Sequence, residues 1–171
     1  MIKSSSLGNQ WEWVRSYPVG GLNQVGFGRN RDLLLVHSPN GLGLFDTLSG
    51  EKIGRDYSAD TPYDLCIGLE IAGFGLLSGE MVRMAGFWGG GLRQNTSDFC
   101  RLDRDGSNWP NEEVILRLAD KRTFNLDMAG EAELRAYGFS DSGHSFVVAT
   151  GASLHIYRRI VNNHSENLSL R

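Results

Sequence analysis

The chain has 171 residues, of which 40% are hydrophobic and 22% charged, and its formal net charge is −3. This size and composition suit one domain with a packed core and exclude bulk disorder. The 22 glycines against 4 prolines indicate many tight turns between short strands. Mild acidity without a long basic tract predicts that the chain does not bind nucleic acid through its phosphates.

The sequence carries features of a cytoplasmic protein. Its two cysteines, Cys66 and Cys100, are too few for the disulfide framework of a small secreted domain, so we expect free thiols in a reducing compartment. Residues 1–8 lack the apolar core of a signal peptide. No stretch reaches the roughly 18 apolar residues of a membrane span, so we expect no membrane partner.

An internal repeat runs at a constant offset of 112 residues. Residues 26–38 align with 138–150, and residues 41–46 align with 153–158, without a gap. Each copy holds a Gly-Phe pair, a polar turn, an apolar run, a turn of small residues and an alternating strand. This pattern predicts two strands joined by a tight turn, with one buried face. The Asn40-Gly41 pair is the strongest hairpin signal in the chain.

Both copies resemble the inner strands of a β-propeller blade of the WD-repeat or quinoprotein-like kind. Residues 46–53, Asp-Thr-Leu-Ser-Gly-Glu-Lys-Ile, resemble the turn after the third strand of such blades, and residues 77–82 repeat that turn. The Gly-His and Trp-Asp pairs of WD repeats are absent. Because such blades run about 40–45 residues, the chain would hold about four short ones.

The resemblance implies an all-β fold of antiparallel sheets of short hairpins, forming a small or partial propeller. One propeller-like domain would span residues 1–160, and residues 161–171 would form a flexible tail. The middle of the chain predicts further strands at residues 64–71, a hairpin of 73–77 with 81–84, and a pair of 114–119 with 122–126. A helix opening at 110–113 is the alternative for the last pair, and a helical turn is expected at 131–135.

No residue pattern in the chain specifies catalysis, a metal or a cofactor. The four histidines lack an orienting partner in sequence, and no Cys-x-x-Cys or His-x-x-x-His spacing occurs. We expect His37 in a strand, His144 in a turn and His155 on the polar face of its strand. Residues 103–108 resemble the start of a calcium loop, but position twelve of that loop is Val114, which favours a simple Asp-Gly turn.

Two segments are candidates for binding a protein partner. The glycine-rich segment 86–93 carries Phe87, Trp88 and Arg93, residue types that dominate binding energy at interfaces; a turn whose aromatic residues point into the core is the alternative. In the second segment, Trp109 follows an Asp-rich turn and is flanked by acidic residues that would form an acidic rim for a basic partner; a solvated turn is the alternative. These acidic residues are Asp103, Asp105, Glu112 and Glu113.

The size, the mild acidity and the cytoplasmic features resemble those of bacterial immunity proteins. That resemblance implies a non-enzymatic protein that neutralises a basic toxin domain, such as a nuclease whose phosphate site the acidic residues would occupy. One alternative is a propeller-like interaction scaffold or ligand-binding module that covers its sheet edges by homo-oligomerising. A second alternative is a hydrolase that uses Asp103, Asp105 or His37.

Overall fold

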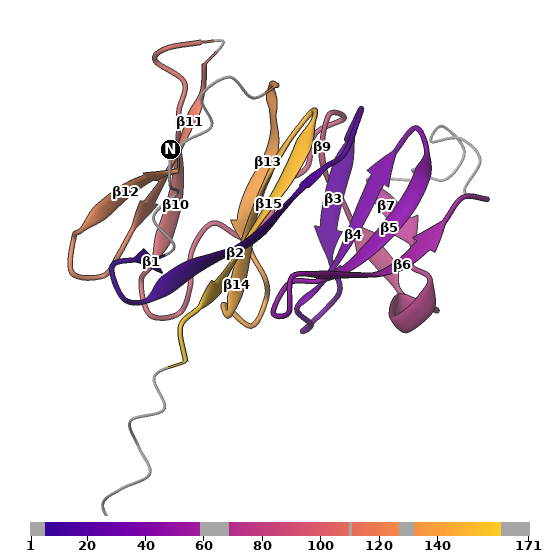
Figure 1. The fold of residues 1–171 in the computed structure, drawn as a ribbon, viewed down its shortest axis with the longest axis horizontal. Helices are drawn as coiled ribbons and strands as arrows, with labels where there is room; N and C mark the ends of the chain where they lie inside the picture. The colour runs from indigo at the N-terminus through magenta and orange to yellow at the C-terminus, as the bar shows by residue number, and fades with distance from the viewer. Residues whose placement is uncertain (1–5, 59–68, 110, 127–131, 162–171) are drawn as a thin grey trace, which may run out of the picture.

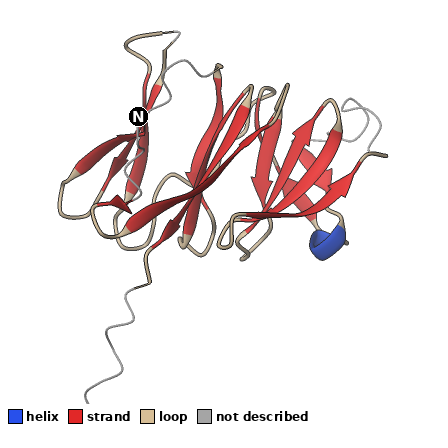
Figure 2. Cartoon of the chain, viewed as in Figure 1, coloured by secondary structure: helices blue, strands red, loops and turns tan. Residues whose placement is uncertain are grey.

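The structure, a computed structural model, describes residues 6–58, 69–109, 111–126 and 132–161. These residues form antiparallel strands in four sheets (Figures 1 and 2). The predicted all-β class, built from short antiparallel hairpins, is confirmed. None of the helices in the described ranges has the length and apolar character needed to cross a membrane.

The two large sheets contain the repeat. The first sheet has the order β1 (Ser6–Leu7), β2 (Trp11–Pro18), β15 (Ser153–Arg159), β14 (Ser145–Thr150) and β13 (Leu134–Phe139). The second has the order β6 (Glu51–Asp56), β5 (Gly41–Asp46), β4 (Leu33–Ser38), β3 (Gln24–Phe27) and β9 (Ala85–Gly86). The predicted repeat is confirmed, because β4 and β14 begin and end 112 residues apart.

The two smaller sheets come from the middle of the chain. The third sheet has the order β10 (Arg101–Asp105), β11 (Glu113–Arg117) and β12 (Thr123–Leu126), and the fourth pairs β7 (Glu70–Ala72) with β8 (Met81–Arg83). One short 3-10 helix, η1 (Gly75–Leu77), joins β7 to β8.

Each copy of the repeat forms three consecutive strands, β3 to β5 or β13 to β15, and the strand beside the third comes from a different part of the chain in each copy. In the second sheet, β6 follows β5 directly along the chain. In the first sheet, the corresponding place beside β15 belongs to β2, from the N-terminal part of the chain. The two ends of the described chain therefore pair within one sheet.

The four sheets stand side by side in an open row (Figure 1). In Figure 1 the third sheet lies at one end, followed by the first and the second, and the fourth overlaps the second, against which it packs. The sheets of the described residues do not close into a barrel. Each neighbouring pair of sheets encloses its own hydrophobic core, so the described chain holds three cores in place of one shared interior.

Strands in the middle of the row are buried on both faces, which explains their continuous apolar runs. Along β4, Leu34 points into the core shared with the first sheet, whereas Leu35 points into the core shared with the fourth. Along β14, Phe146 and Val147 divide in the same way between two cores. The prediction of a single buried face per hairpin is therefore wrong for these strands.

His155 is also buried by this packing on both faces, so its expected position on a polar face of the strand is wrong. It is 2% exposed, and its ring nitrogens lie 2.6 Å from Ser16 Oγ and 3.1 Å from Ser153 Oγ. A polar side chain is stable there because both nitrogens have hydrogen-bond partners. His37 lies in a strand and His144 in a bend, close to what the sequence predicts.

The middle of the chain departs from its predicted elements in two places. The strand that pairs with β8 is Glu70–Ala72, and Gly75–Leu77 is helical instead. The backbone of Gly75 has φ +58°, which ends an extended strand. The predicted helical turn is wrong at Leu134 and Arg135, which begin β13.

The hairpin predicted between 114–119 and 122–126 is confirmed by the β11–β12 pairing, and the alternative helix is wrong at Glu113, which begins β11. Three predicted features lie partly outside the described residues. These are the strand at 64–71, of which residues 64–68 including Cys66 are not described, the helical turn at residue 131, and residues 162–171 of the tail.

Candidate functional site

The strand ends and their connections lie along two opposite rims of the row of sheets (Figure 1). We define the lower rim by the connections at residues 28–32, 47–50, 96–99 and 140–144. The upper rim contains residues 39–40, 57–58, 87–91, 106–109 and 151–152. The two rims differ in how their side chains are used.

Polar side chains of the lower rim tie the first and second sheets together. The carboxylate of Asp32 accepts hydrogen bonds from the hydroxyls of Ser142 at 2.9 Å and Ser145 at 2.8 Å. The Ser145 hydroxyl also lies 2.6 Å from that of Thr47. These contacts satisfy polar groups of both copies of the repeat and leave them in a structural role.

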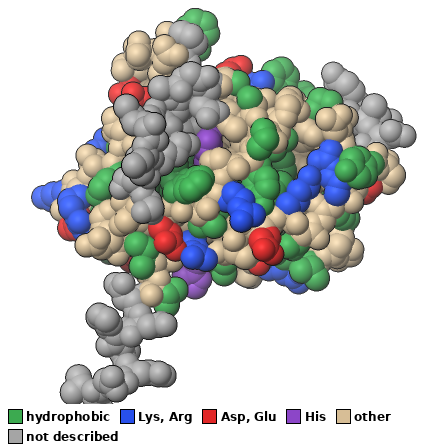
Figure 3. Space-filling model, viewed as in Figure 1, with side chains coloured by type: hydrophobic (Ala, Val, Ile, Leu, Met, Phe, Trp, Pro, Cys, Tyr) green, Lys and Arg blue, Asp and Glu red, His purple; other side chains and the backbone are tan. Residues whose placement is uncertain are grey.

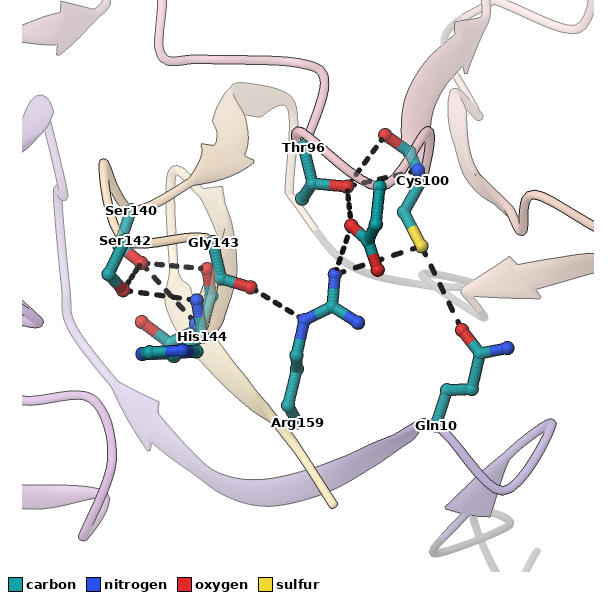
Figure 4. Close-up of polar contacts among 10 residues, drawn as sticks. Gln10, Thr96, Cys100, Ser140, Ser142, Gly143, His144 and Arg159 are labelled. Atoms are coloured by element: carbon teal, nitrogen blue, oxygen red, sulfur yellow. Dashed lines mark hydrogen bonds and ion pairs between the residues drawn. The ribbon is translucent and has the colours of Figure 1, made fainter. Parts of the chain in front are cut away.

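Arg159 ties the first sheet to the segment that leads into the third (Figure 4). Its Nε donates to the carbonyl of Gly143 at 2.8 Å, and its Nη2 donates to Asp98 Oδ1 at 2.6 Å. The thiol of Cys100 is buried 4.0 Å from the same guanidinium and 3.9 Å from Gln10 Oε1. The cluster therefore holds turns in place.

Ser142 and His144 are neighbours at the lower rim, and they meet through the backbone of His144. The hydrogen bond between them runs from the backbone N–H of His144 to Ser142 Oγ, at 3.0 Å (Figure 4). The Ser142 hydroxyl donates to Asp32. The base within hydrogen-bond reach of the Ser142 oxygen is therefore the Asp32 carboxylate, which also accepts from Ser145, and not the His144 imidazole.

The two aromatic residues of the glycine-rich segment differ in exposure at the upper rim. Phe87 is 59% exposed, with the Arg135 guanidinium 5.0 Å from its ring centroid, while Trp88 is half-buried with its ring 6.0 Å from that of His37. Gly90 allows this turn, because its φ is +80° and a Cβ there would lie 2.3 Å from the carbonyl of Met84. The segment thus presents one aromatic residue outward and turns one inward.

Arg93 does not join these aromatic residues. It lies near the lower rim, bridged to Phe139, and its Nη1 donates to the carbonyl of Asp141 at 3.1 Å. Trp109, in the β10–β11 connection, is 74% exposed. Phe87 and Trp109 are therefore the predicted binding residues that the upper rim displays.

The predicted acidic rim is largely neutralised by arginines. Asp103 forms ion pairs with Arg101 at 2.5 Å and with Arg117 at 2.6 Å. Glu112 is 8% exposed and is paired with Arg104. A carboxylate that is paired with arginine adds little net negative charge to the surface that this chain offers to a partner.

Two acidic residues beside Trp109 keep their carboxylates at the surface. Asp105 accepts the backbone N–H of Ser107 at 2.9 Å, and hydrogen bonds from Ser107 lower the pKa of Asp105. Glu113 is exposed and accepts from Asn125 Nδ2 at 3.0 Å. Asp105 therefore stays ionised well below neutral pH.

The ion pairs of Asp103 predict a measurable dependence of stability on pH. Partial burial opposes ionisation of Asp103, but hydrogen bonds from Arg117 and Arg101 outweigh it and lower the pKa of the carboxyl below 3.8. This group stabilises the fold above pH 4, and its contribution is lost as pH falls through the lowered pKa. We expect Asp103→Asn to lower the free energy of unfolding by about 0.5–1 kcal/mol at pH 7.

Urea unfolding at several pH values between 7 and 2 tests this expectation. The two proteins should converge in stability at the acid end, because Asp103 is then protonated. A difference that stays constant over the whole range would assign the effect to something other than the Asp103 charge.

The residues named for hydrolysis lie apart. Asp103 is in the third sheet, whereas His37 is 4% exposed in the second, and burial lowers its pKa. The first sheet stands between them (Figure 1). Across the described ranges, no group of three or more His, Cys, Asp or Glu side chains is arranged to hold a metal ion.

Two cavities contain residues that sequence reasoning missed. One, of about 270 Å³, opens at the upper rim between β2 and the β5–β6 pair and includes Lys52 and Arg55. The other, of about 350 Å³, lies between β3, β8 and the 91–93 segment and holds acidic and basic residues together. The sequence disperses these residues over several strands, so no local motif marks them.

The chain matches no known protein family, and no curated protein matches it.

Proposed function

We propose that this chain acts by binding a protein partner at its upper rim, through Phe87 and Trp109. The supporting observation is that both side chains are more than half exposed, although large aromatic side chains normally gain free energy by burial. A partner that covers them would recover that free energy. The glycine turn and the Arg135 contact hold Phe87 in place, which reduces the entropy lost on binding.

The form of partner that we propose is a toxin domain that the chain neutralises, as immunity proteins do. Asp105 and Glu113 place negative charge beside Trp109, and this charge favours a basic partner surface and speeds its association. The pairing of Asp103 and Glu112 with arginines leaves a narrower acidic surface than the sequence predicts.

Affinity capture from the source cells tests this function with matched variants. The wild-type chain should retain one main partner, and the double variant Phe87→Ala with Trp109→Ala should bind it about 100-fold more weakly, from about 1–2 kcal/mol per aromatic residue. Phe99→Ala is the control, because Phe99 is 81% exposed but lies in the lower-rim turn.

Coexpression then tests the toxin assignment. The wild-type chain should restore growth to cells that produce the captured partner, and the double variant should not. A partner that is harmless to cells would refute neutralisation. Binding that survives the double variant, or is lost in Phe99→Ala, would refute the upper rim as the binding surface.

The alternative function, a ligand-binding module, is favoured by one separate observation. The upper-rim cavity between β2 and β6 gathers basic and aromatic side chains, and these can bind a small molecule without any protein partner.

A further inference from the structure

The upper-rim cavity is built from two sheets. On the β2 side, Tyr17 forms its wall, fixed by a hydrogen bond from its hydroxyl to the carbonyl of Gly50 at 2.8 Å. On the β5–β6 side, Phe45 meets Tyr17 edge-on, with ring centroids 5.0 Å apart. Tyr57 is 77% exposed at the mouth. Tyr17 and Phe45 therefore form an aromatic wall of the cavity, which Val19 and Val36 also line.

A β-bulge places two cations on the same wall. Residues 52 and 55 would face opposite sides of a regular strand, because side chains alternate. In β6 the register shifts, so that Lys52 lies opposite Phe45 and Arg55 lies opposite Gly43. Both side chains consequently face the cavity, and the glycine opposite Arg55 leaves space beside it.

Among the described residues, no carboxylate neutralises either cation. The described residues that line the cavity include no Asp or Glu, and neither Lys52 nor Arg55 forms an ion pair within the described chain. Arg55 donates from Nη2 to the carbonyl of Asn40 at 2.7 Å, while its buried Nε has no hydrogen-bond partner there. Its guanidinium also lies 4.8 Å from the Tyr57 ring centroid.

The two cations lie near each other at the cavity, with Lys52 at its exposed edge. Partial burial and, to a smaller extent, the neighbouring Arg55 lower the pKa of Lys52. The Asp103 and Glu112 pairs show that the same chain elsewhere places its arginines beside acids. Uncompensated positive charge in a concave site is the arrangement expected of an anion-binding site. Figure 3 shows Lys and Arg side chains gathered on this face along β6.

We propose that the cavity between β2 and β6 binds a small organic anion, in which a carboxylate or phosphate group meets Lys52 and Arg55 and a planar ring lies against Tyr17 and Phe45. Arg55 is suited to the anionic group because its guanidinium carries further N–H donors besides the Nη2 hydrogen bond to Asn40. A volume of about 270 Å³ limits the enclosed part of the ligand to roughly one ring and its anionic group.

Titration calorimetry with simple probes tests the proposal. Phenyl phosphate and benzoate should bind in the millimolar range or tighter, inorganic phosphate should bind more weakly, and phenol should not bind. The comparison separates the contribution of the charge from that of the ring. Equal binding of phenol and phenyl phosphate, or binding of none of the probes, would overturn the proposal.

Variants then locate the site. Lys52→Met and Arg55→Met should each weaken phenyl phosphate binding about tenfold, the equivalent of about 1.4 kcal/mol. Lys121→Met, in the β11–β12 turn, removes an equal charge far from the cavity and should bind normally. Undiminished binding by both cavity variants would contradict the assignment.

Thermal unfolding without ligand separates a ligand site from a structural role. Lys52→Met should unfold at or above the wild-type temperature, because a repulsion between like charges is removed, but it should lose the stabilisation that phenyl phosphate gives the wild type. A less stable Lys52→Met variant with normal ligand stabilisation would overturn the proposal. Phe87 and Trp109 line no part of this cavity. The outcome of these ligand experiments therefore does not decide whether the chain binds a protein partner.

Discussion

Replacing Trp11 with alanine is expected to lower the free energy of unfolding by about 3–5 kcal/mol. Trp11 is fully buried, and its ring centroid lies 5.5 Å from that of Phe139 and 5.0 Å from that of Phe146. The Arg159 guanidinium covers the ring at 4.5 Å. The substitution therefore removes the largest side chain from the core between the first and third sheets and leaves a cavity there.

Trp109→Ala is the matched control for this prediction. It deletes the same side chain, but Trp109 is 74% exposed in a connection, so its stability should change by no more than about 0.5 kcal/mol. Urea unfolding followed by far-ultraviolet circular dichroism measures both variants without depending on tryptophan fluorescence. Equal losses of stability would show that Trp11 is not in the core.

The second large effect concerns β2, the strand that the N-terminal part of the chain contributes to the first sheet. Removing residues 1–18 should prevent folding, because β15 would keep β14 on one side but lose β2 on the other along its whole length, from Ser153 opposite Pro18 to Arg159 opposite Trp11. The loss would also expose an unpaired strand, which favours aggregation. Circular dichroism and size-exclusion chromatography should show an unfolded or aggregated chain.

A circular permutant supplies the control for this truncation. Opening the chain between Gly20 and Gly21, and joining Arg171 to Met1, retains every residue and makes β2 follow β15. Ile160 already donates its backbone N–H to Gln10 at 2.9 Å, so the two strands meet where the new connection would form. The permutant should unfold cooperatively near the wild-type midpoint. A folded truncation would contradict the role of β2.

The repeat was predictable because its signals are local. Alternating apolar residues and the Asn40-Gly41 turn define a hairpin within a dozen residues. The structure accordingly places β4 and β5 where the sequence predicts them. The same reasoning locates β14 and β15 112 residues further along the chain.

Features that depend on distant partners were not predictable from a single sequence. The pairing of β2 with β15 joins opposite ends of the chain, and no local pattern specifies it. His155 occupies a polar position in an alternating strand, yet it is buried on the face of β15 where Tyr157 packs against the third sheet. The sequence shows Asp103 as a surface acid, while its pairing with Arg117 depends on the β10–β11 register.

In the candidate sites, too, local features could be predicted from the sequence, whereas features that depend on distant residues could not. Composition alone marks Phe87 and Trp88 as unusual, but which of the two is exposed depends on the turn and on contacts from His37 and Arg135. The basic cavity was missed because Lys52 and Arg55 face the same way only through the bulge in β6. A bulge depends on pairing between strands and leaves no clear mark in the residues that form it.

Hydrogen exchange of the captured complex tests most directly whether the upper rim is the recognition surface. Backbone amides of residues 87–91 and 106–109 should exchange more slowly in the complex than in the free chain. Amides of residues 28–32 and 140–144, at the lower rim, should exchange equally fast in both. Slower exchange confined to the lower rim would contradict the proposed function.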